Sequence, residues 1–492
     1  MTTQDNPKLP AAPALLTTLQ GEKHHETEAS LLVTWDGDED PQHPFNWPQA
    51  RKWAITILLS NGGLVTLMSG AMLAPALHSI AHDLETDEEE TQIFLSIFIL
   101  AFAFGPMVLS PLAEVFGRRP VWLLGSCFYV LWNTVAGFSQ TPGLMIASRV
   151  LSGIGASVEF AITQPVLSDC WVPAERGKSF SISTFIPLLG PAIGPIIGGV
   201  VTQTIGWRWT FWILSIYDGT LIIIGVVVLQ ETYEPILLAK KAAKLRETTG
   251  KSYHVDTESS TLTTKLSRSL SRPFRLLFTQ PILQVVAIFL AYNFGILYIV
   301  LSTFANLWIE RYGQSESQSG LHYIALVLGY TIAAQVGGKV MDRLWAYLKS
   351  KHGDNTAPEY RVPLMVPGAI LIPLGLFIYG WTAEKHHDYH WIVPDIGIGI
   401  FGCGIILNTQ AMQAYVVEAY RKYVASAFAA AQFLRSVAGF AFPIFAPSMY
   451  RNIGYGWGNT ILGLTFIAIG WPAPFLLWRY GAKLREMGKP QW

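Results

Sequence analysis

The sequence contains few charged residues and few cysteines. Asp, Glu, Lys and Arg together make up 14% of the 492 residues, and 34 basic side chains balance 34 acidic ones. A neutral chain of this kind offers no electrostatic footprint for nucleic acid. The three cysteines, Cys127, Cys170 and Cys403, lie in or beside apolar runs, and their spacing forms neither a disulfide framework nor a metal site. We therefore expect neither a disulfide-stapled domain nor a nucleic-acid-binding protein.

Catalytic and nucleotide-binding motifs are also missing. No GxSxG, HExxH or P-loop pattern occurs, so neither a hydrolase nor ATP-driven chemistry is indicated. The cluster His386, His387, Asp388 and His390 lies in a short turn between apolar runs, without ligands at helical spacing, which disfavours a metal site. The first fifty residues show no basic start followed by an apolar core, so no cleaved signal peptide is expected. We expect no enzyme activity, no metal and no cofactor.

Apolar residues, in contrast, are abundant and fall in long blocks. Hydrophobic residues make up 51% of the chain, which is high for a soluble globular protein. A transmembrane helix needs about 20 mainly apolar residues. Blocks of that length occur twelve times, six on each side of a polar break, at 53–76, 91–113, 120–138, 142–165, 180–203, 208–230, 281–307, 320–342, 363–382, 391–416, 424–447 and 458–480. The sequence therefore predicts an all-α integral membrane protein with twelve transmembrane helices.

The two sets of six blocks look like copies of one unit. SPLAEVFGRRP (110–120) closes the second block and GGKVMDRLW (337–345) closes the eighth, and aligning Glu114 with Asp342 also superposes the starts of blocks one and seven. Such repeats indicate two pseudo-symmetric six-helix bundles. The expected domains are a disordered tail, a first bundle, a central loop, a second bundle and a short tail, at 1–50, 51–230, 231–280, 281–482 and 483–492.

The distribution of Lys and Arg predicts the orientation. Basic residues gather in the turns after even-numbered blocks, in the central loop and near both ends of the chain. The other side carries only Arg208, Arg311, Lys385 and Arg451, together with the acidic turn 83–90. Because cytoplasmic loops are enriched in Lys and Arg, we expect both termini and the central loop in the cytoplasm. The plasma membrane is the default location, with the vacuolar membrane as the alternative.

The central loop contains two further patterns. The stretch 237–248, LLAKKAAKLRET, has helical periodicity and a basic face, which suits a helix lying on an anionic leaflet. Ser267, Ser269 and Ser271 follow among basic residues, and this stretch is interpreted as a solvated linker or, alternatively, a phosphorylation target.

The fifth block contains the stretch PLLGPAIGPIIGG at 187–199. Gly190, Gly194 and Gly198 recur every four residues and line one face of a helix, which lets another helix approach closely in lipid. Pro191 and Pro195 lie on the neighbouring stripe, where each removes a backbone donor and loosens the helix. A helix that is tightly packed and bendable suits a moving part. The alternative is a packing motif without motion.

The fourth block contains two charged residues at membrane depth, Arg149 and Glu159. A charge at the bilayer centre costs about 2.5–3.5 kcal/mol on insertion scales, so such groups face a cavity or a partner. Ser152, Glu159 and Thr163 share one stripe of the helix. We interpret Glu159 as a cavity-facing carboxylate that carries a proton. A structural Glu hydrogen-bonded to a neighbouring helix is the alternative.

Other polar residues at membrane depth are spread over both halves, as the lining of a central cavity would be. Aromatic and amide side chains suit amphipathic organic molecules better than ions or phosphates. Interhelical hydrogen bonds are the alternative for each residue, and Arg435 would either bind an anionic group or pair with an acidic side chain. The cavity candidates are Asn61, Asn293, Tyr298, Asn408, Gln413, Gln432 and Arg435.

Charged turns on the cytoplasmic side are candidates for a gate. Glu114 lies four residues before Arg118, with Gly117 allowing a tight bend, and Asp169 and Arg176 follow the fourth block. Surface ion pairs worth about 0–1 kcal/mol each can act together as a latch between rocking halves. Ordinary turn charges are the alternative reading. The repeat adds Asp342 and Arg343 in the second half.

These motifs together resemble the major facilitator superfamily, and more narrowly its fungal twelve-span drug:proton antiporters. SPLAEVFGRRP, RVLSGIG in block four and GPAIGPIIGG in block five carry the superfamily resemblance. FNWPQARKWAI, GWRWTFW, LQETYEP and FLRSVAGFAFPIFAP point to the branch, so the similarity covers about 41–488. The resemblance implies alternating access and proton-coupled export of small amphipathic compounds such as drugs, toxins, polyamines or secondary metabolites.

The resemblance also assigns roles to particular residues. Arg149 matches the family's span-four arginine, implicated in proton coupling, whereas Glu159 has no counterpart in the family pattern. Ser110 and Glu114 replace the Gly and Asp of the family turn, which predicts looser helix contact but keeps the charge. The family turn falls on Ser110, Leu112, Glu114, Gly117 and Arg118, and the antiporter motif on Gly190, Pro191, Gly194, Pro195, Gly198 and Gly199.

The expected partners are a small organic substrate, protons and the lipid bilayer, with the chain acting as a monomer. Proton-symport uptake of a small solute or polyamine on the same fold is the first alternative function. A non-transporting receptor or a multispan enzyme is the second, and it would need a convergent catalytic constellation or a large extramembrane domain, neither of which the sequence shows.

Overall fold

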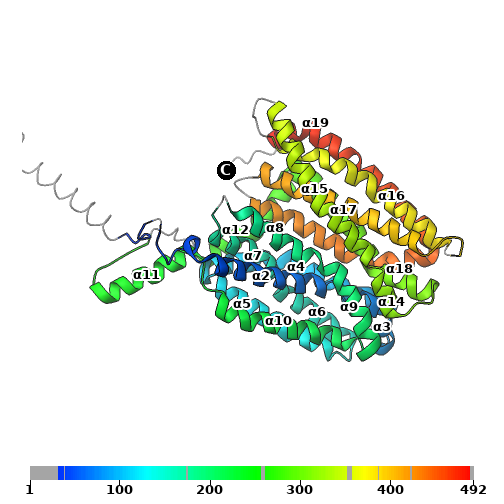
Figure 1. Ribbon diagram of the computed structural model, residues 1–492, viewed down its shortest axis with the longest axis horizontal. Helices are drawn as coiled ribbons and strands as arrows, with labels where there is room; N and C mark the ends of the chain where they lie inside the picture. The colour runs from blue at the N-terminus through cyan, green and yellow to red at the C-terminus, as the bar shows by residue number, and fades with distance from the viewer. Residues whose placement is uncertain are drawn as a thin grey trace, which may run out of the picture.

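A computed structural model describes residues 32–37, 39–172, 175–255, 261–351, 357–385, 387–420 and 424–487. Long helices run side by side and form two bundles (Figure 1). The only extended pairing in these residues is an isolated bridge between Leu32 and His254. The predicted all-α architecture is therefore confirmed.

The first bundle contains the helices of the first half of the chain. Three of the predicted spans are interrupted: the first after Ser69, the fourth at Ser157 and the fifth at Leu189. The last of these breaks lies between Pro187 and Pro191, where missing backbone donors weaken the helix. The elements are α2 (Gln49–Ser69), η2 (Ala74–Ala76), α3 (Leu77–Leu84), α4 (Glu88–Phe116), α5 (Arg118–Gly137), α6 (Pro142–Ala156), α7 (Val158–Cys170), α8 (Arg176–Leu188), α9 (Gly190–Ile205) and α10 (Arg208–Val228).

The second bundle contains the helices of the second half. A π-helical turn, η3, prolongs its first helix, and a short 3-10 helix, η4, precedes α16. The elements are α13 (Pro281–Asn306), η3 (Leu307–Arg311), α14 (Glu316–Leu321), α15 (Ile324–Lys351), η4 (Pro358–Leu364), α16 (Met365–Glu384), α17 (Ile392–Ala419), α18 (Val424–Gly470) and α19 (Pro472–Met487).

The number of membrane-crossing helices agrees with the predicted twelve. Ten helices of the described residues are long and apolar enough to span, and one of them runs over Ser426–Met487. Gly454, with φ 75° and ψ 170°, breaks this long helix and separates the last two predicted spans. The third predicted span is α5, which is not among the ten. Counting the last helix as two spans and adding α5 gives twelve spans.

Helix ends follow local sequence signals. Asp87 caps α4, because its side chain accepts a hydrogen bond of 2.7 Å from the backbone N–H of Glu90. Gly117 ends α4 with φ 104°, a backbone conformation that favours glycine. Thr141 caps α6, and Pro142 follows at its first position, where the missing N–H costs nothing.

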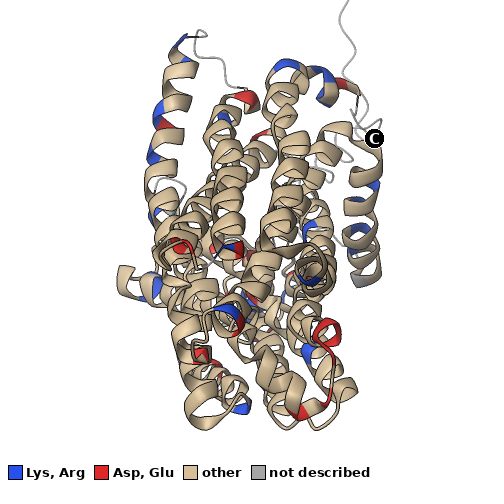
Figure 2. Cartoon of the chain, turned by 90° about the vertical axis from the view of Figure 1, so that its right-hand side faces the viewer, with Lys and Arg blue, Asp and Glu red and all other residues tan. Residues whose placement is uncertain are grey.

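The outer faces of the bundles are apolar. Leu124 on α5 and Ile223 and Val227 on α10 are more than two-thirds exposed, as lipid-facing side chains are. Most of each long helix consists of residues other than Lys, Arg, Asp and Glu, drawn in tan in Figure 2. The two ends of the bundles are named by their elements (Figure 1). The end where α2 begins and where α12 (Leu262–Thr279) lies is called the basic end. The end where α3 stops and where α14 lies is called the opposite end.

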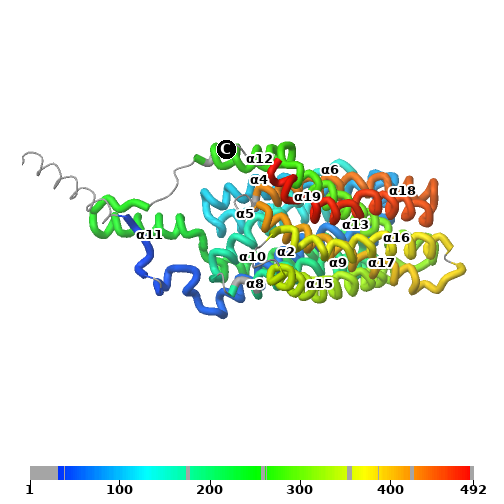
Figure 3. Tube along the Cα trace, turned by 90° about the horizontal axis from the view of Figure 1, so that it is seen from above, coloured from blue at the N-terminus to red at the C-terminus, as the bar shows by residue number. Residues whose placement is uncertain are grey.

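The segment before α2 is folded against the central part of the chain. η1 (Pro44–Asn46) precedes α2. The stretch 237–248, predicted as a basic helix, lies within α11 (Glu234–Thr249) (Figure 3). Trp35 Nε1 donates to Glu234 at 2.6 Å, and Lys241 pairs with Asp36 and Asp40 at 2.9 and 3.2 Å. The expectation of a disordered tail over 1–50 therefore does not hold for 33–37 and 39–47. Residues 1–31 and 38 lie outside the described part.

Candidate transport pathway between the two bundles

At the opposite end the two bundles touch backbone to backbone. A Cβ atom placed on Gly199 of α9 would lie 2.3 Å from the carbonyl oxygen of Glu316 in α14. A Cβ atom on Gly320 of α14 would lie 2.6 Å from the carbonyl oxygen of Pro195. Only glycine allows so close an approach. Gly199 and Gly320 thus form a seam between the bundles, called the glycine seam.

Polar contacts surround the glycine seam and also join the two bundles. Ser317 N–H donates to Gln203 Oε1 at 3.2 Å, and Ser79 donates to the carboxylate of Glu316. Further around the same end, Glu88 forms an ion pair with Arg451. The opposite end is therefore closed by contacts that cross from one bundle to the other.

At the basic end of the first bundle, charged residues pair within that bundle. Arg118 lies 3.6 Å from Asp169, and the carboxylate of Glu231 accepts from the backbone N–H of Arg118 at 2.9 Å. Glu114 pairs with Lys265 of α12 at 3.8 Å, rather than with Arg118 four residues on. The side chain of Arg176, a predicted member of this group, lies outside the described residues.

The second bundle repeats this arrangement at its own basic end. Arg361 pairs with Glu418 at 2.7 Å and with Asp342 at 3.6 Å, and Arg485 pairs with Glu359. Arg343, the predicted neighbour, is exposed. In the described part of the chain, no ion pair at the basic end joins a transmembrane helix of one bundle to one of the other.

Arg149 is fully buried and ties three helices of the first bundle together. Its guanidinium donates to the carbonyl oxygens of Phe94 and Ser69 at 2.8 and 3.0 Å, and lies 4.3 Å above the ring of Phe98. Because α2 ends at Ser69, this carbonyl has no helical partner, and a cation at a helix C-terminus also complements the helix dipole. Arg149 thus stabilises the break in the first span.

Glu159 lies inside the first bundle. Its side chain is 4% exposed, accepts a hydrogen bond of 2.8 Å from Trp122 Nε1, and packs against Gly62 of α2. Its second carboxylate oxygen has no hydrogen-bond partner among the described residues. The carboxylate therefore faces α2 and α5 of its own bundle, which corrects the expectation that it lines the space between the bundles.

Asp218 of α10 is a second buried carboxylate in the same region. It is 4% exposed, and one of its oxygens has no hydrogen-bond partner in the described part of the chain. Neither Asp218 nor Trp122 was among the predicted site residues. A Cβ atom on Gly225 of α10 would lie 2.4 Å from the Trp122 ring, so a small residue at this position is the signal that could have indicated a large neighbour.

The glycines of the antiporter motif have two different neighbours. Gly190, Gly194 and Gly198 face α2 of the same bundle, and a Cβ atom on Gly198 would lie 2.1 Å from the carbonyl oxygen of Met72. Gly199 faces the second bundle in the glycine seam. Pro191 and Pro195 stand at the first turn and in the interior of α9. α9 therefore connects the broken first span to the second bundle.

Three of the predicted cavity residues make contacts within one bundle. Tyr217 donates to Asn61 at 2.6 Å, and Asn293 donates to Thr409 at 3.3 Å. Asn408 is fully buried against Gly368. These side chains form interhelical contacts, the alternative that the sequence left open.

Two of the remaining cavity candidates, Tyr298 and Gln432, lie around Arg435 of α18. Its guanidinium lies 3.8 Å from the ring centre of Phe294 and donates to Gln432 Oε1 at 3.4 Å. Tyr298 packs beside Phe294 with ring centres 4.7 Å apart, and a Cβ atom on Gly70 of the first bundle would lie 3.5 Å from its hydroxyl, so Tyr298 reaches the first bundle. Gln413 is partly exposed on α17.

Comparison with known proteins identifies the family. The sequence matches the profile described as Major Facilitator Superfamily over residues 59–443. It is 40% identical over 460 residues to "Efflux pump vrtL" of Penicillium aethiopicum, covering 93% of this chain and 91% of that protein. It is 41% identical over 419 residues to "Probable efflux pump mfs2" of Aspergillus flavus, covering 84% of this chain and 98% of that protein.

The fold is also found among solved structures. The xylose transporter XylE from E. coli, in a partially occluded inward open conformation, aligns with a TM-score of 0.61 and 15% identity, covering 88% of this chain and 98% of that one. At this identity the likeness shows the fold alone, and it agrees with two bundles of six helices. Together with the profile and the two relatives, it shows that this chain belongs to the major facilitator superfamily.

Proposed function

We propose that this chain is a proton-coupled efflux transporter that exports small amphipathic organic compounds by alternating access. The carrying observation is the difference between the two ends of the bundles: contacts cross between the bundles at the opposite end, whereas ion pairs stay within each bundle at the basic end. The bundles also pack along α4 and α18, where the ring centres of Phe104 and Phe433 lie 5.5 Å apart. Two rigid halves that meet along contacts without strong ion pairs are what a rocking mechanism requires. The relatives named as efflux pumps support export as the direction.

The basic end faces the cytoplasm in this proposal. Arg118, Arg361 and the basic residues of α12 lie there, and cytoplasmic loops are enriched in Lys and Arg. The structure then corresponds to a state closed toward the outside. Opening to the outside requires the glycine seam and the Glu88–Arg451 pair to separate. The plasma membrane is the proposed location, and the monomer is the proposed working unit.

The proton site lies in the first bundle, at Glu159 and Asp218. Both carboxylates are buried in the same bundle, and none of the ion pairs between described residues places a cation in contact with either. Arg149 of the same bundle is engaged with backbone carbonyls. Two buried carboxylates without a cation are most readily accommodated by binding a proton. The Arg149 contacts support a positioning role for this residue.

Transport rather than catalysis is the activity we infer, and an accumulation assay tests its direction. Cells that express the full chain are loaded with a fluorescent amphipathic compound, with and without a proton uncoupler. Export predicts more retained compound when the proton gradient collapses, whereas uptake by symport predicts less. Purified protein in liposomes that moves no compound of a broad panel would contradict transport altogether.

Variants of the carboxylates test the proton site separately. We expect Glu159→Gln and Asp218→Asn to abolish the response of export to the proton gradient while leaving compound binding in place. Glu247→Gln, an exposed position on α11, is the matched control for expression and should behave as the unmodified chain. Unchanged gradient-driven export in both carboxylate variants would place the proton elsewhere.

A further inference from the structure

Arg435 is a cation at the middle depth of the membrane. It lies about 16 Å along α18 from the start of that helix at Val424, at 1.5 Å per residue, which is roughly half of a hydrocarbon core of about 30 Å. Its side chain is partly exposed despite this depth. A charge at this position needs a partner or access to water.

Among the described residues, no acidic side chain supplies that partner. The one hydrogen bond of Arg435 in this part of the chain joins its Nη1 to Gln432 Oε1 at 3.4 Å, and none of the ion pairs between described residues includes it. Guanidinium groups carry five donors, so most remain for another molecule. A neutral amide and the face of Phe294 are weak substitutes for a carboxylate.

The other deep cation of the described residues is already engaged. Arg149 donates to the carbonyl oxygens of Phe94 and Ser69. The deep carboxylates Glu159 and Asp218 lie in the first bundle, and neither forms an ion pair with Arg435. Arg435 is thus the deep cation whose described neighbours leave its pairing capacity unused.

The groups around Arg435 are aromatic rings and hydroxyl donors. Phe294 and Tyr298 pack together with ring centres 4.7 Å apart, and the guanidinium lies 3.8 Å from the ring centre of Phe294. The hydroxyl of Tyr298 adds a donor to the same cluster. Donors beside aromatic faces are suited to an aromatic molecule that carries an anionic oxygen.

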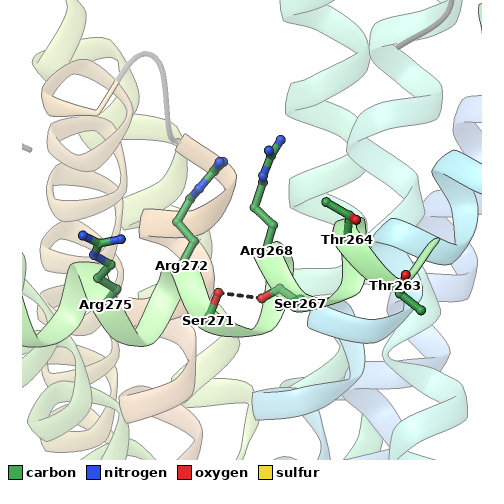
Figure 4. A pocket seen from close by; sticks show the side chains of 7 residues that line it. All are labelled: Thr263, Thr264, Ser267, Arg268, Ser271, Arg272 and Arg275. Atoms are coloured by element: carbon green, nitrogen blue, oxygen red, sulfur yellow. Dashed lines mark hydrogen bonds between the residues drawn. The ribbon is translucent and has the colours of Figure 1, made fainter. Parts of the chain in front are cut away.

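A separate feature at the basic end also favours an anionic ligand. Arg268, Arg272 and Arg275 project from one face of α12 and line a hollow of about 590 Å³ together with Ser267 and Ser271, among other residues (Figure 4). A row of like charges raises the local concentration of ligands of opposite sign.

α12 is also placed to present this row to both bundles. Lys265 of α12 pairs with Glu114 of α4 at 3.8 Å, and Phe274 packs on Phe433 of α18 with ring centres 4.8 Å apart. The arginine row therefore lies on a helix that touches the first bundle and the second.

We propose that the cargo is an organic anion, an amphipathic aromatic compound whose carboxylate or acidic phenol pairs with Arg435 while its rings pack on Phe294 and Tyr298. The arginine row of α12 attracts this anion at the basic end. The assignment rests on the proposed transport function and specifies its substrate class. An anion that leaves as a proton enters moves charge in the direction that an inside-negative membrane potential favours for both.

Binding to the purified full chain tests the assignment directly. The probes are pyrenebutyrate and its methyl ester, which share the ring system and differ in charge, and the readout is the ligand-dependent shift in melting temperature. We expect the acid to bind about tenfold more tightly than the ester, and Arg435→Gln to remove that difference. Arg435→Lys should retain part of it, and Arg479→Gln, an exposed arginine on α19, should leave it unchanged.

The outcomes separate this inference from the transport function. Equal binding of acid and ester, or an acid preference that persists in Arg435→Gln, overturns the anion assignment. If cells export cationic rhodamine 123 or neutral esters but no aromatic acid of a matched panel, the transport function stands and the assignment fails. If no compound is exported, the transport function itself fails.

The dependence of export on ionic strength tests the arginine row separately. The double variant Arg268→Gln and Arg272→Gln should lower the initial export rate of an aromatic acid a few-fold at low ionic strength and have little effect at high ionic strength, because salt screens exposed charges. An equal loss at both ionic strengths would overturn the attraction by this row.

Discussion

The two ends of the helical bundles are held together in different ways. At the opposite end, glycine backbones of α9 and α14 touch and exposed polar groups bridge the gap. At the basic end, each bundle has its own network of ion pairs, and α12 contacts both bundles. The difference indicates that each bundle is a rigid unit and that the movable contacts lie between the units.

The exposure of the ion pairs also indicates that the bundles are rigid and that the contacts between them are movable. The side chains of Arg361 and Glu418 are each 16% exposed, whereas those of Arg451 and Glu88 are 60% and 52% exposed. Breaking a largely buried pair leaves a charge without its partner and is costly, but exposed pairs contribute little. Strong pairs within the bundles and weak pairs between them allow one state to convert into the other.

A bulky residue in the glycine seam should have the largest effect, because it prevents the opposite end from closing. Gly320→Leu places a side chain where even a Cβ atom would lie 2.6 Å from the Pro195 carbonyl oxygen, so the opposite end cannot close as described. Overpacking costs about 1–3 kcal/mol or more, which predicts a loss of export by about tenfold or more. Export of a fluorescent compound from intact cells measures the effect.

The control for this variant is Gly338→Leu on α15. A Cβ atom at Gly338 meets no described atom within 4 Å, so the same substitution there should leave export within about twofold of the unmodified chain. Cysteine crosslinking across the opposite end should also fail in Gly320→Leu and succeed in Gly338→Leu. Normal closure and export in both variants would show that the seam does not have to close.

Removing a strong pair within the second bundle should lower stability. Arg361→Gln leaves Glu418 and Asp342 without their cation, which predicts a loss of about 1–3 kcal/mol in the free energy of unfolding. Arg343→Gln, beside this network but exposed, should change stability by less than about 0.5 kcal/mol. Thermal unfolding in detergent compares the two, and equal melting temperatures would contradict the proposed rigidity.

Much of this fold could be predicted from the sequence because membrane helices leave a strong local signal. Apolar block length indicated the twelve spans, and the repeated turn indicated the two halves. The interruptions at Ser69 and Ser157 could not be predicted, because they depend on packing; Arg149, for example, stabilises the first break by binding the Ser69 carbonyl. The apolar blocks predicted a break between 447 and 458, and Gly454 supplies it.

The site was harder to predict because sequence periodicity gives the face of a helix but not its neighbour. The stripe of Glu159 was recognised, yet only the packing of α2, α5 and α7 shows that this stripe faces Trp122 and Gly62. The open question for Arg435, an anion or an acidic side chain as partner, likewise needed the positions of the surrounding helices. Among the described residues no carboxylate forms an ion pair with it.

Removing the exposed pair at the opposite end should have a smaller effect. Glu88→Gln abolishes the ion pair with Arg451 but keeps the shape of the side chain. Exposed pairs are worth about 0–1 kcal/mol, so we expect a modest shift of the population toward the state open at the opposite end. Fluorescence energy transfer between labels on α3 and α18 measures this shift. The difference from the unmodified chain should shrink in high salt, and a salt-independent difference would contradict an electrostatic latch.

The smallest effect concerns the contact between the segment 33–47 and α11 beyond the basic end. Hydrogen bonds from the backbone N–H groups of Asp36 and Gln42, with Lys241 adding its charge, hold the pKa of Asp40 below its ordinary value of 3.8. A depressed folded pKa means that the stabilisation is complete above the ordinary pKa and is lost as the pH falls through the folded value. We therefore expect hydrogen-exchange protection of 33–47 to be constant from pH 7 to about 5 and to decline below about 4.

Asp40→Asn supplies the matched comparison for this pH effect. The amide cannot ionise, so the variant should show weaker protection of 33–47 near pH 7 and no further loss in acid, while the ion pairs of the second bundle remain unaffected. If the unmodified chain keeps full protection down to pH 3, the carboxylate does not hold the segment in place. The contact would then rest on its other polar contacts, such as the hydrogen bond from Trp35 to Glu234 and the ion pair between Lys241 and Asp36.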